Sequence, residues 1–312
     1  MLLKSAKFLL ILVSAAWWML CGIGSAIAQQ SHWGRGYLPN VPVIDQDGRT
    51  LKFYDDVIKD KIVVVSFIYT VCKDICPLLT ARLSLLQEQL GDQVGRDFFF
   101  VSISIDPETD TPDRLKQYAN AFRLGPGWTF LTGTKADIDL IRYKLGERSR
   151  TLAEHRKEIL LGNDRTGEWA RDSAFSDLVV LANNVRDMDP AWLHGNREPD
   201  TITEANVTTA TNQPGQTLFL KTCGSCHTVG KGNRVGPDLL GLLERRDRPW
   251  VTRYMMAPEV LRAQQDPTAM ELAQRYRAVR MPNLGLSEDD VADLLHFVES
   301  QSKTVAVSTK AP

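Results

Sequence analysis

The chain lacks the features that mark several large functional classes. Its 37 basic and 38 acidic residues leave a net charge of −1, so it has no basic excess of the kind that nucleic-acid-binding proteins carry. It has neither an internal repeat nor a low-complexity tract. A hydrophobic share of 43% with 24% charged residues is that of an ordinary soluble globular protein. A length of 312 residues suits two domains.

The first 28 residues do not belong to either domain. An apolar run from Phe8 to Ile27 follows two lysines and ends in the small-residue pattern Ala26-Ile27-Ala28. This pattern predicts an export signal over residues 1–28 that is cleaved before Gln29. The run is longer than the apolar part of most signals, so an uncleaved single membrane anchor is the alternative. In both cases the rest of the chain lies outside the cytoplasm.

Cysteine is scarce, with five in the whole chain, and one of these, Cys21, lies in the signal. The other four form two close pairs, Cys72 with Cys76 and Cys223 with Cys226. Exported proteins normally join distant cysteines, whereas close pairs are more often redox-active or metal-binding. The spacing therefore predicts two chemical sites.

Residues 29–185 alternate between apolar runs and helical patterns, which predicts an α/β domain. The runs over 61–69 and 98–105 are rich in β-branched and aromatic residues, as in strands buried on both faces. Further signals predict strands over 128–131 and 158–161, and helices over 77–91, from Thr111 and Pro112 onward, and over 137–145.

Apolar periodicity fades over residues 186–213, which predicts a surface linker. Residues 214–303 then show only helical patterns, and residues 304–312 form a tail. We expect helices before Cys223, near 250–256, near 268–277, and from Ser287, where Asp290 completes a capping box. The second domain is thus predicted to be all-α.

The segment Cys223-Gly224-Ser225-Cys226-His227 is a C-x-x-C-H motif, the attachment signature of a c-type haem. Cysteines three apart on a helix lie on one face, so both thiols reach the two vinyl groups of the porphyrin. The adjacent imidazole of His227 then faces the iron. The motif predicts one covalently bound haem c, which also requires export.

The sixth ligand of the iron should come from a later residue. We expect Met281, because thioether ligation opposite histidine raises the reduction potential and suits electron transfer. Met255 and Met256 are the rival ligands, and core packing is the alternative role of Met281.

The C-terminal part resembles the class I cytochrome c family. The resemblance rests on the C-x-x-C-H motif, on the run Val235-Gly236-Pro237-Asp238-Leu239 and on Met281-Pro282 before a capped final helix, and it covers about residues 214–300. It implies His227 as proximal and Met281 as distal ligand of the haem. His296 falls within the final helix and is interpreted as a structural histidine.

The first pair, Cys72 and Cys76, stands four apart where a buried strand gives way to a helix. Residues four apart share a helix face, and the N-terminal end of a helix favours thiolates. Two such thiols can form a disulfide or bind a soft cation, for which copper(I) is the natural choice. An inert structural disulfide is the alternative.

Around this pair the sequence resembles the Sco/SenC family of thioredoxin-like copper proteins. The resemblance spans about residues 38–183 and rests on the C-x-x-x-C-P motif within Phe67–Pro77, on Ser102–Pro107, on Asp110-Thr111-Pro112 and on Tyr118. It implies a thioredoxin fold that binds one copper ion through Cys72, Cys76 and His155, with a role in building the binuclear copper centre of cytochrome oxidase.

Two positions depart from that family's usual pattern. Lys73 stands where proline is common, and His155 lies in Glu154-His155-Arg156 instead of the commoner Asp-His-Ser. Asp106 and Asp110 have two possible roles. They shape the loop of the site, or they belong to an ordinary solvent-exposed turn and helix start.

The two sites together predict a periplasmic copper-delivery or thiol-redox protein, soluble or tethered to the inner membrane, whose haem exchanges single electrons with the copper or thiol site. Its expected partner is the copper-bearing subunit of cytochrome oxidase or another exported redox protein. A thiol-disulfide oxidoreductase or peroxide reductase that uses Cys72 as nucleophile is one alternative. A pure electron carrier, in which the first domain only docks partners, is the other.

Overall fold

The computed structural model describes residues 33–72, 75–154, 158–195, 213–277 and 279–308. The predicted signal or anchor over residues 1–28 lies outside this range, as do His155 and most of the predicted linker. Within the described residues, no helix is both long and apolar enough to cross a membrane.

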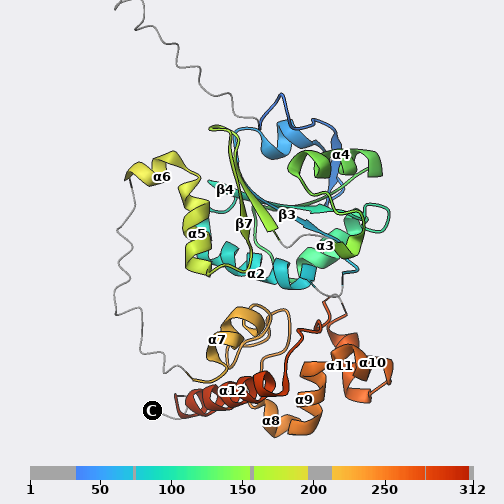
Figure 1. Ribbon diagram of the computed structural model, residues 1–312, viewed down its shortest axis with the longest axis vertical. Coiled ribbons are helices and arrows are strands. Elements are labelled where there is room, and N and C mark those ends of the chain that lie inside the picture. Colours follow the sequence, from blue (N-terminus) through green and yellow to red (C-terminus); the bar gives the residue numbers. More distant parts are fainter. Residues whose placement is uncertain (1–32, 73–74, 155–157, 196–212, 278, 309–312) are drawn as a thin grey trace, which may run out of the picture. The chain divides into compact units, whose positions relative to one another are not determined.

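The first domain is built on a mixed sheet (Figure 1). Its seven strands lie in the order β2-β1-β5-β4-β3-β6-β7. The strands are β1 (Pro42–Asp45), β2 (Thr50–Lys52), β3 (Ile62–Ile68), β4 (Phe98–Ser104), β5 (Trp128–Thr132), β6 (Glu158–Asn163) and β7 (Glu168–Ser173). The α-helices are α2 (Ile75–Leu90), α3 (Pro112–Ala121), α4 (Lys135–Leu145), α5 (Leu178–Asp187) and α6 (Pro190–Gly195), and a π-helix covers Phe53–Ile58.

The centre of the sheet has the topology expected of a thioredoxin-like domain. Strands β3 and β4 are parallel and are joined by α2, while β6 runs antiparallel to β3 and pairs with β7. A parallel pair needs a helical crossover of this kind, whereas the antiparallel pair β6 and β7 needs only a short turn. The predicted α/β fold class is confirmed.

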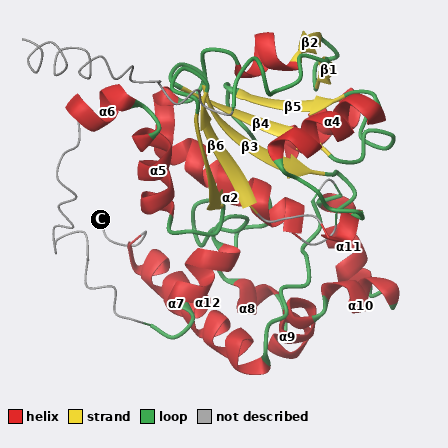
Figure 2. Cartoon of the chain, turned by 45° about the horizontal axis from the view of Figure 1, so that its top comes forward, coloured by secondary structure: helices red, strands yellow, loops and turns green. Residues whose placement is uncertain are grey.

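All seven residues of β3 are buried, because the strand has a helical layer on each face of the sheet. Ile62, Val64 and Ile68 belong to the apolar cluster that includes residues of α2 and α5. Val63 and Val65 belong to the opposite cluster, which includes residues of α4 and of the π-helix. Figure 2 shows these helices around the sheet. A period of two along the strand thus explains the continuous apolar run.

Helices α3 and α4 begin directly after residues whose side chains can cap a helix N-terminus. The hydroxyl of Thr111 accepts a hydrogen bond from the backbone N–H of Arg114 at 3.4 Å, and Pro112 is the first residue of α3, as predicted. Helix α4 begins two residues earlier than expected, because Thr134 caps it through the backbone N–H of Asp137 at 3.2 Å. Both helices therefore start at a threonine N-cap.

A short helix, α6, lies inside the range expected to be linker. The carboxylate of Asp189 accepts the backbone N–H of Ala191 at 3.0 Å, and Pro190 is the first helical residue. The guanidinium of Arg186 lies over the ring of Trp192, 5.4 Å from its centroid. The helix has only six residues, too few to show an apolar periodicity in the sequence.

The second domain is helical, and its described residues contain no strand. Its α-helices are α7 (Gln216–Leu218), α8 (Leu242–Arg245), α9 (Arg248–Met256), α10 (Pro258–Ala263), α11 (Pro267–Arg275) and α12 (Glu288–Ser308), and a π-helix covers Phe219–Cys223. Phe219 and Phe297 of α12 meet in the core with their ring centroids 5.1 Å apart. The predicted capping box is present, since the Ser287 hydroxyl accepts the backbone N–H of Asp290 while the Asp290 carboxylate accepts that of Ser287.

Candidate functional sites

The thiols of Cys72 and Cys76 lie at the junction between β3 and α2. Cys76 is the second residue of α2, and its backbone N–H donates to the sulfur of Cys72 at 3.4 Å. The Cys72 sulfur is thus held at the N-terminal end of the helix, where unpaired N–H groups favour negative charge. Both residues are buried, and neither forms a disulfide.

Burial dominates the electrostatics of the second thiol. It raises the pKa of Cys76 well above the ordinary range, and the neighbouring Cys72 raises it further. An uncompensated thiolate at this position would be costly, because the charge would be desolvated. A soft cation bound at the same place would offset that cost, and proton loss would then accompany metal binding.

Asp110 ties together the chain segments that surround the thiol pair. The backbone N–H and the hydroxyl of Thr70 donate to its carboxylate at 3.1 and 2.5 Å, and the hydroxyl of Ser104 donates at 2.6 Å. Ser104 also accepts the backbone N–H of Asp106 at 3.0 Å. Thr70 lies two residues before Cys72, so the buried carboxylate fixes the loop that carries this cysteine. Of the two roles considered for Asp110, the structure shows the loop-shaping one.

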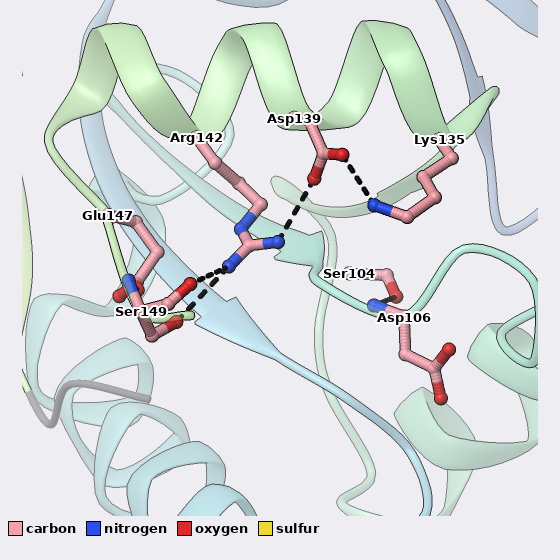
Figure 3. A network of polar contacts seen from close by, with 7 residues as sticks. All are labelled: Ser104, Asp106, Lys135, Asp139, Arg142, Glu147 and Ser149. Carbon is pink, nitrogen blue, oxygen red and sulfur yellow. Dashed lines mark hydrogen bonds and ion pairs between the residues drawn. The ribbon is translucent and has the colours of Figure 1, made fainter. Parts of the chain in front are cut away.

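The predicted third copper ligand, His155, lies outside the described residues. The chain that leads toward it is anchored to α4, as Figure 3 shows. Arg142 donates to the carbonyl and the hydroxyl oxygen of Ser149, both at 3.1 Å, and forms an ion pair with Asp139. The buried side chain of Glu147 accepts the backbone N–H of Ser149 at 2.9 Å. The ligand role of His155 stays a prediction.

The second site is an apolar cavity in the helical domain. Cys223, Cys226 and His227 line it together with Met281. The chain turns sharply at the motif, since the backbone N–H groups of Cys226 and His227 both donate to the carbonyl of Cys223, at 3.0 and 2.8 Å. All four side chains predicted to hold a haem thus share one cavity.

The imidazole of His227 is oriented for metal ligation. Its Nδ1 lies 2.8 Å from the carbonyl oxygen of Pro237, and burial lowers the pKa of the ring, which favours the neutral form. A neutral ring that donates from Nδ1 keeps the lone pair of Nε2 free for a metal. Gly236 makes room for this ring, because a Cβ there would lie 2.5 Å from Cε1 of His227.

The two cysteines of the motif sit in an environment that disfavours charge. Burial raises the pKa of Cys223 to about 12 and that of Cys226 to about 11. As free thiols they would be neutral at physiological pH, and thioether bonds, which carry no charge, suit the same surroundings. The donor set and the apolar walls fit a c-type haem.

The three candidate methionines occupy different positions. Met281 and Pro282 line the cavity, whereas Met255 and Met256 of α9 pack against the apolar core of the domain. This placement favours Met281 as the sixth ligand. His296 lies on the exposed side of α12 and does not line the cavity.

The sequence did not point to two cavity residues that the structure reveals, Tyr254 of α9 and Arg262 of α10. Arg262 also donates a hydrogen bond to the carbonyl of Met281 at 3.4 Å. Neither residue belongs to a recognisable motif, and α10 is too short to show a helical period, so no sequence signal could have revealed them.

Two protein families match the chain, each over one of its domains. Residues 41–158 match the SCO1/SenC family, and residues 213–302 match the cytochrome c family. These ranges contain Cys72 and Cys76 in the first domain and the C-x-x-C-H motif with Met281 in the second.

Individual relatives match the first domain. An SCO1 protein homolog of Bacillus subtilis is 37% identical over 90 residues, which are 28% of this chain and 45% of the relative. A putative copper-binding protein of Stutzerimonas stutzeri is 29% identical over 109 residues, which are 35% of this chain and 52% of the relative. The matched part thus spans about half the length of these relatives.

Among solved structures, a SCO1/SenC family lipoprotein of Bacillus anthracis is similar, with 24% identity and a TM-score of 0.43. The alignment covers 50% of this chain and 95% of the other. The two family matches and the topology of the sheet assign the two domains: the chain joins a SCO1/SenC domain with a thioredoxin-like fold to a helical cytochrome c domain.

Proposed function

We propose that this is an exported copper-binding and thiol-redox protein whose tethered c-type haem exchanges single electrons with the copper or thiol site. Its proposed role is to assist the assembly of the copper centre of cytochrome oxidase, with the copper-bearing subunit or another exported redox protein as partner. The proposed location is the periplasm, in soluble form or tethered to the inner membrane.

One observation carries the proposal. The same chain holds two buried cysteines that form no disulfide at the start of α2, and a cavity lined by Cys223, Cys226, His227 and Met281. The first is suited to a soft metal or to disulfide chemistry, and the second to a covalently bound porphyrin.

In the first domain, Cys72, Cys76 and His155 are the proposed ligands of one copper ion. The name of the Stutzerimonas relative supports this metal, and so does the softness of two thiolates. Asp110 and Thr70 would hold the loop before Cys72 in place while the incoming ion displaces the thiol protons, which pass to the solvent.

In the second domain, His227 and Met281 would hold the haem iron. Such a haem would supply one-electron chemistry, which matches the one-electron difference between Cu(II) and Cu(I). A disulfide needs two electrons, and thioredoxin-type disulfides have potentials of about −270 to −120 mV. A high-potential haem is a poor donor to such a bond, so copper is the better matched partner.

The proposal is tested by copper titration of the full mature protein under anaerobic conditions. Wild-type protein with reduced haem should bind one Cu(II), reduce it to Cu(I) and gain one equivalent of ferric haem. Cys72→Ser should lose both the copper and the haem oxidation, because one thiolate is removed. Val71→Ser is the matched control, since it changes an exposed residue of the same loop and keeps both thiols.

Stoichiometric copper in Cys72→Ser would refute the copper site. A single-turnover thiol assay without metal separates the enzymatic alternative, because a thiol oxidoreductase would turn over in the absence of copper. If the protein were a pure electron carrier, Cys76→Ser would leave electron transfer through the haem unchanged.

A further inference from the structure

The segment that carries Met281 has no regular secondary structure of its own. Residues 281–287 connect the region after α11 to α12 without forming a helix or a strand. The position of a ligand on such a segment is fixed by the contacts between the segment and the rest of the domain. The position of the Met281 thioether therefore depends on what the segment touches.

Helix α10 contacts the segment at two points. Arg262 donates from Nη1 to the carbonyl oxygen of Met281 at 3.4 Å. Glu259 accepts a hydrogen bond from the side-chain amide of Asn283 at 2.8 Å. Glu259 and Arg262 are three residues apart, so they lie on the same face of the helix.

The second contact also determines the turn after the ligand. The side-chain oxygen of Asn283 accepts the backbone N–H of Gly285 at 2.9 Å, and Gly285 has a φ of 65°, in the left-handed region that favours glycine. Glu259 thus orients the side-chain amide of Asn283, and the oxygen of that amide closes the turn. The contact acts on the main chain just after Met281 and Pro282.

Helix α10 is itself held firmly. Pro258 and Leu261 are buried, and the backbone N–H of Asp266 donates to the carbonyl of Leu261 at 3.0 Å just after the helix ends. Arg262 reaches the cavity beside Tyr254 of α9. Burial raises the pKa of Tyr254, and the charge of Arg262 and a hydrogen bond from it moderate that rise. The helix is therefore a fixed support for the segment.

We propose that Glu259 and Arg262 are positioning residues that hold the Met281 segment so that its thioether stays on the haem iron. The inference rests on the proposed ligand role of Met281 and adds what keeps that ligand in place. Loss of either contact is expected to raise the population of protein with a vacated sixth position by roughly fivefold, the scale of one hydrogen bond.

The test uses ferric, haem-loaded, copper-free full-length protein and imidazole as the competing ligand. The thioether-to-iron absorption band in the red part of the spectrum reports Met281 ligation. Glu259→Ala and Arg262→Ala should bind imidazole about fivefold more tightly than wild type and lose the band at lower imidazole concentration. Glu259→Gln keeps an acceptor oxygen for Asn283 and should restore wild-type affinity.

Glu271→Ala is the matched control, because Glu271 is an exposed glutamate of α11 that pairs with Arg246 and not with the Met281 segment. If Arg262→Ala fails to retain haem, Asn283→Ala serves in its place, because it removes the partner of Glu259 on the segment. It must show the same fivefold increase in imidazole affinity. Wild-type imidazole affinity in Glu259→Ala and Asn283→Ala, with the band intact, would overturn the positioning role alone. Absence of the band from wild type, or its persistence in Met281→Ala, would instead overturn the ligand assignment on which both proposals depend.

Discussion

The ring of His227 lies directly against the main chain of Gly236, where a Cβ atom would come within 2.5 Å of Cε1. The next residue, Pro237, offers its carbonyl to Nδ1 of the same ring at 2.8 Å. One residue thus makes room for the imidazole and its neighbour orients it. The Gly236-Pro237 pair of the sequence motif has a direct physical explanation.

Gly236→Ala should reduce covalent haem incorporation several-fold, because either the imidazole or the main chain must move to relieve the overlap. Haem per polypeptide in the purified protein measures the effect. Gly224→Ala is the control within the same site, since a Cβ there would meet its nearest neighbour at an ordinary 3.4 Å. Equal haem content in both variants would contradict this explanation.

Removal of the Asp110 carboxylate should destabilise the first domain. In Asp110→Ala the donors on Thr70 and Ser104 lose their acceptor inside the protein, which costs about 1–3 kcal/mol of unfolding free energy. Denaturant unfolding of the full chain measures the loss. Asp106→Ala is the control, because Asp106 contacts Ser104 through its backbone N–H, which the substitution keeps. A smaller effect in Asp110→Ala than in Asp106→Ala would count against the network.

The stability of the second domain should depend on pH through Asp238. Burial acts to raise the pKa of Asp238, but hydrogen bonds from the backbone N–H groups of Gly230, Leu240 and Gly232 outweigh it, so the pKa lies below the ordinary value. A carboxyl with a lowered folded-state pKa stabilises the protein above its unfolded-state pKa, near 4, and this contribution is lost as the pH falls through the folded-state value.

Asp238→Asn should therefore lower the unfolding free energy by about 1 kcal/mol at pH 7, a modest figure because the site is largely solvated. The two proteins should become closer in stability as the pH falls below the unfolded-state pKa, because Asp238 is progressively protonated. Unfolding curves at pH 7, 5 and 3 measure the difference. If the difference in unfolding free energy stays constant over this pH range, the carboxylate charge does not contribute to stability.

The thiol of Cys76 should be unreactive in the folded protein. Cys76 is fully buried and its pKa is raised far above the ordinary range, so the native protein should resist its alkylation between pH 7 and 9. After unfolding it should react at the rate of an ordinary cysteine. Short pulses of iodoacetamide followed by mass spectrometry measure the modified fraction at each position. Equal rates for Cys76 in the folded and unfolded protein would contradict the structure.

The elements predictable from the sequence are those with a strong local signal. The strand β3 is an unbroken apolar run, α3 begins with Thr111 and Pro112, and α12 begins with the Ser287 capping box, so each was located within one or two residues. The two cysteine pairs were visible because their spacing follows from the chemistry they serve.

Features that depend on contacts between distant residues could not be predicted in this way. Helix α6 and helix α10 have six residues each, which is shorter than two helical turns. The hydrogen bond between Glu259 and Asn283 spans 24 positions and follows no pattern in the sequence. The sequence left the role of Asp110 open, because an aspartate before a helix is ordinary until its three donors are seen.

We have proposed that one exported polypeptide carries a covalently bound haem and a thiol pair that binds copper. The decisive experiment is iron and copper analysis of the mature wild-type protein, purified with copper available. Acid extraction of the same sample then shows whether the haem stays on the polypeptide. We expect one iron in extraction-resistant haem and one copper per chain. Haem that is removed by extraction, or a protein that holds no copper while Cys72 and Cys76 are reduced, would contradict it.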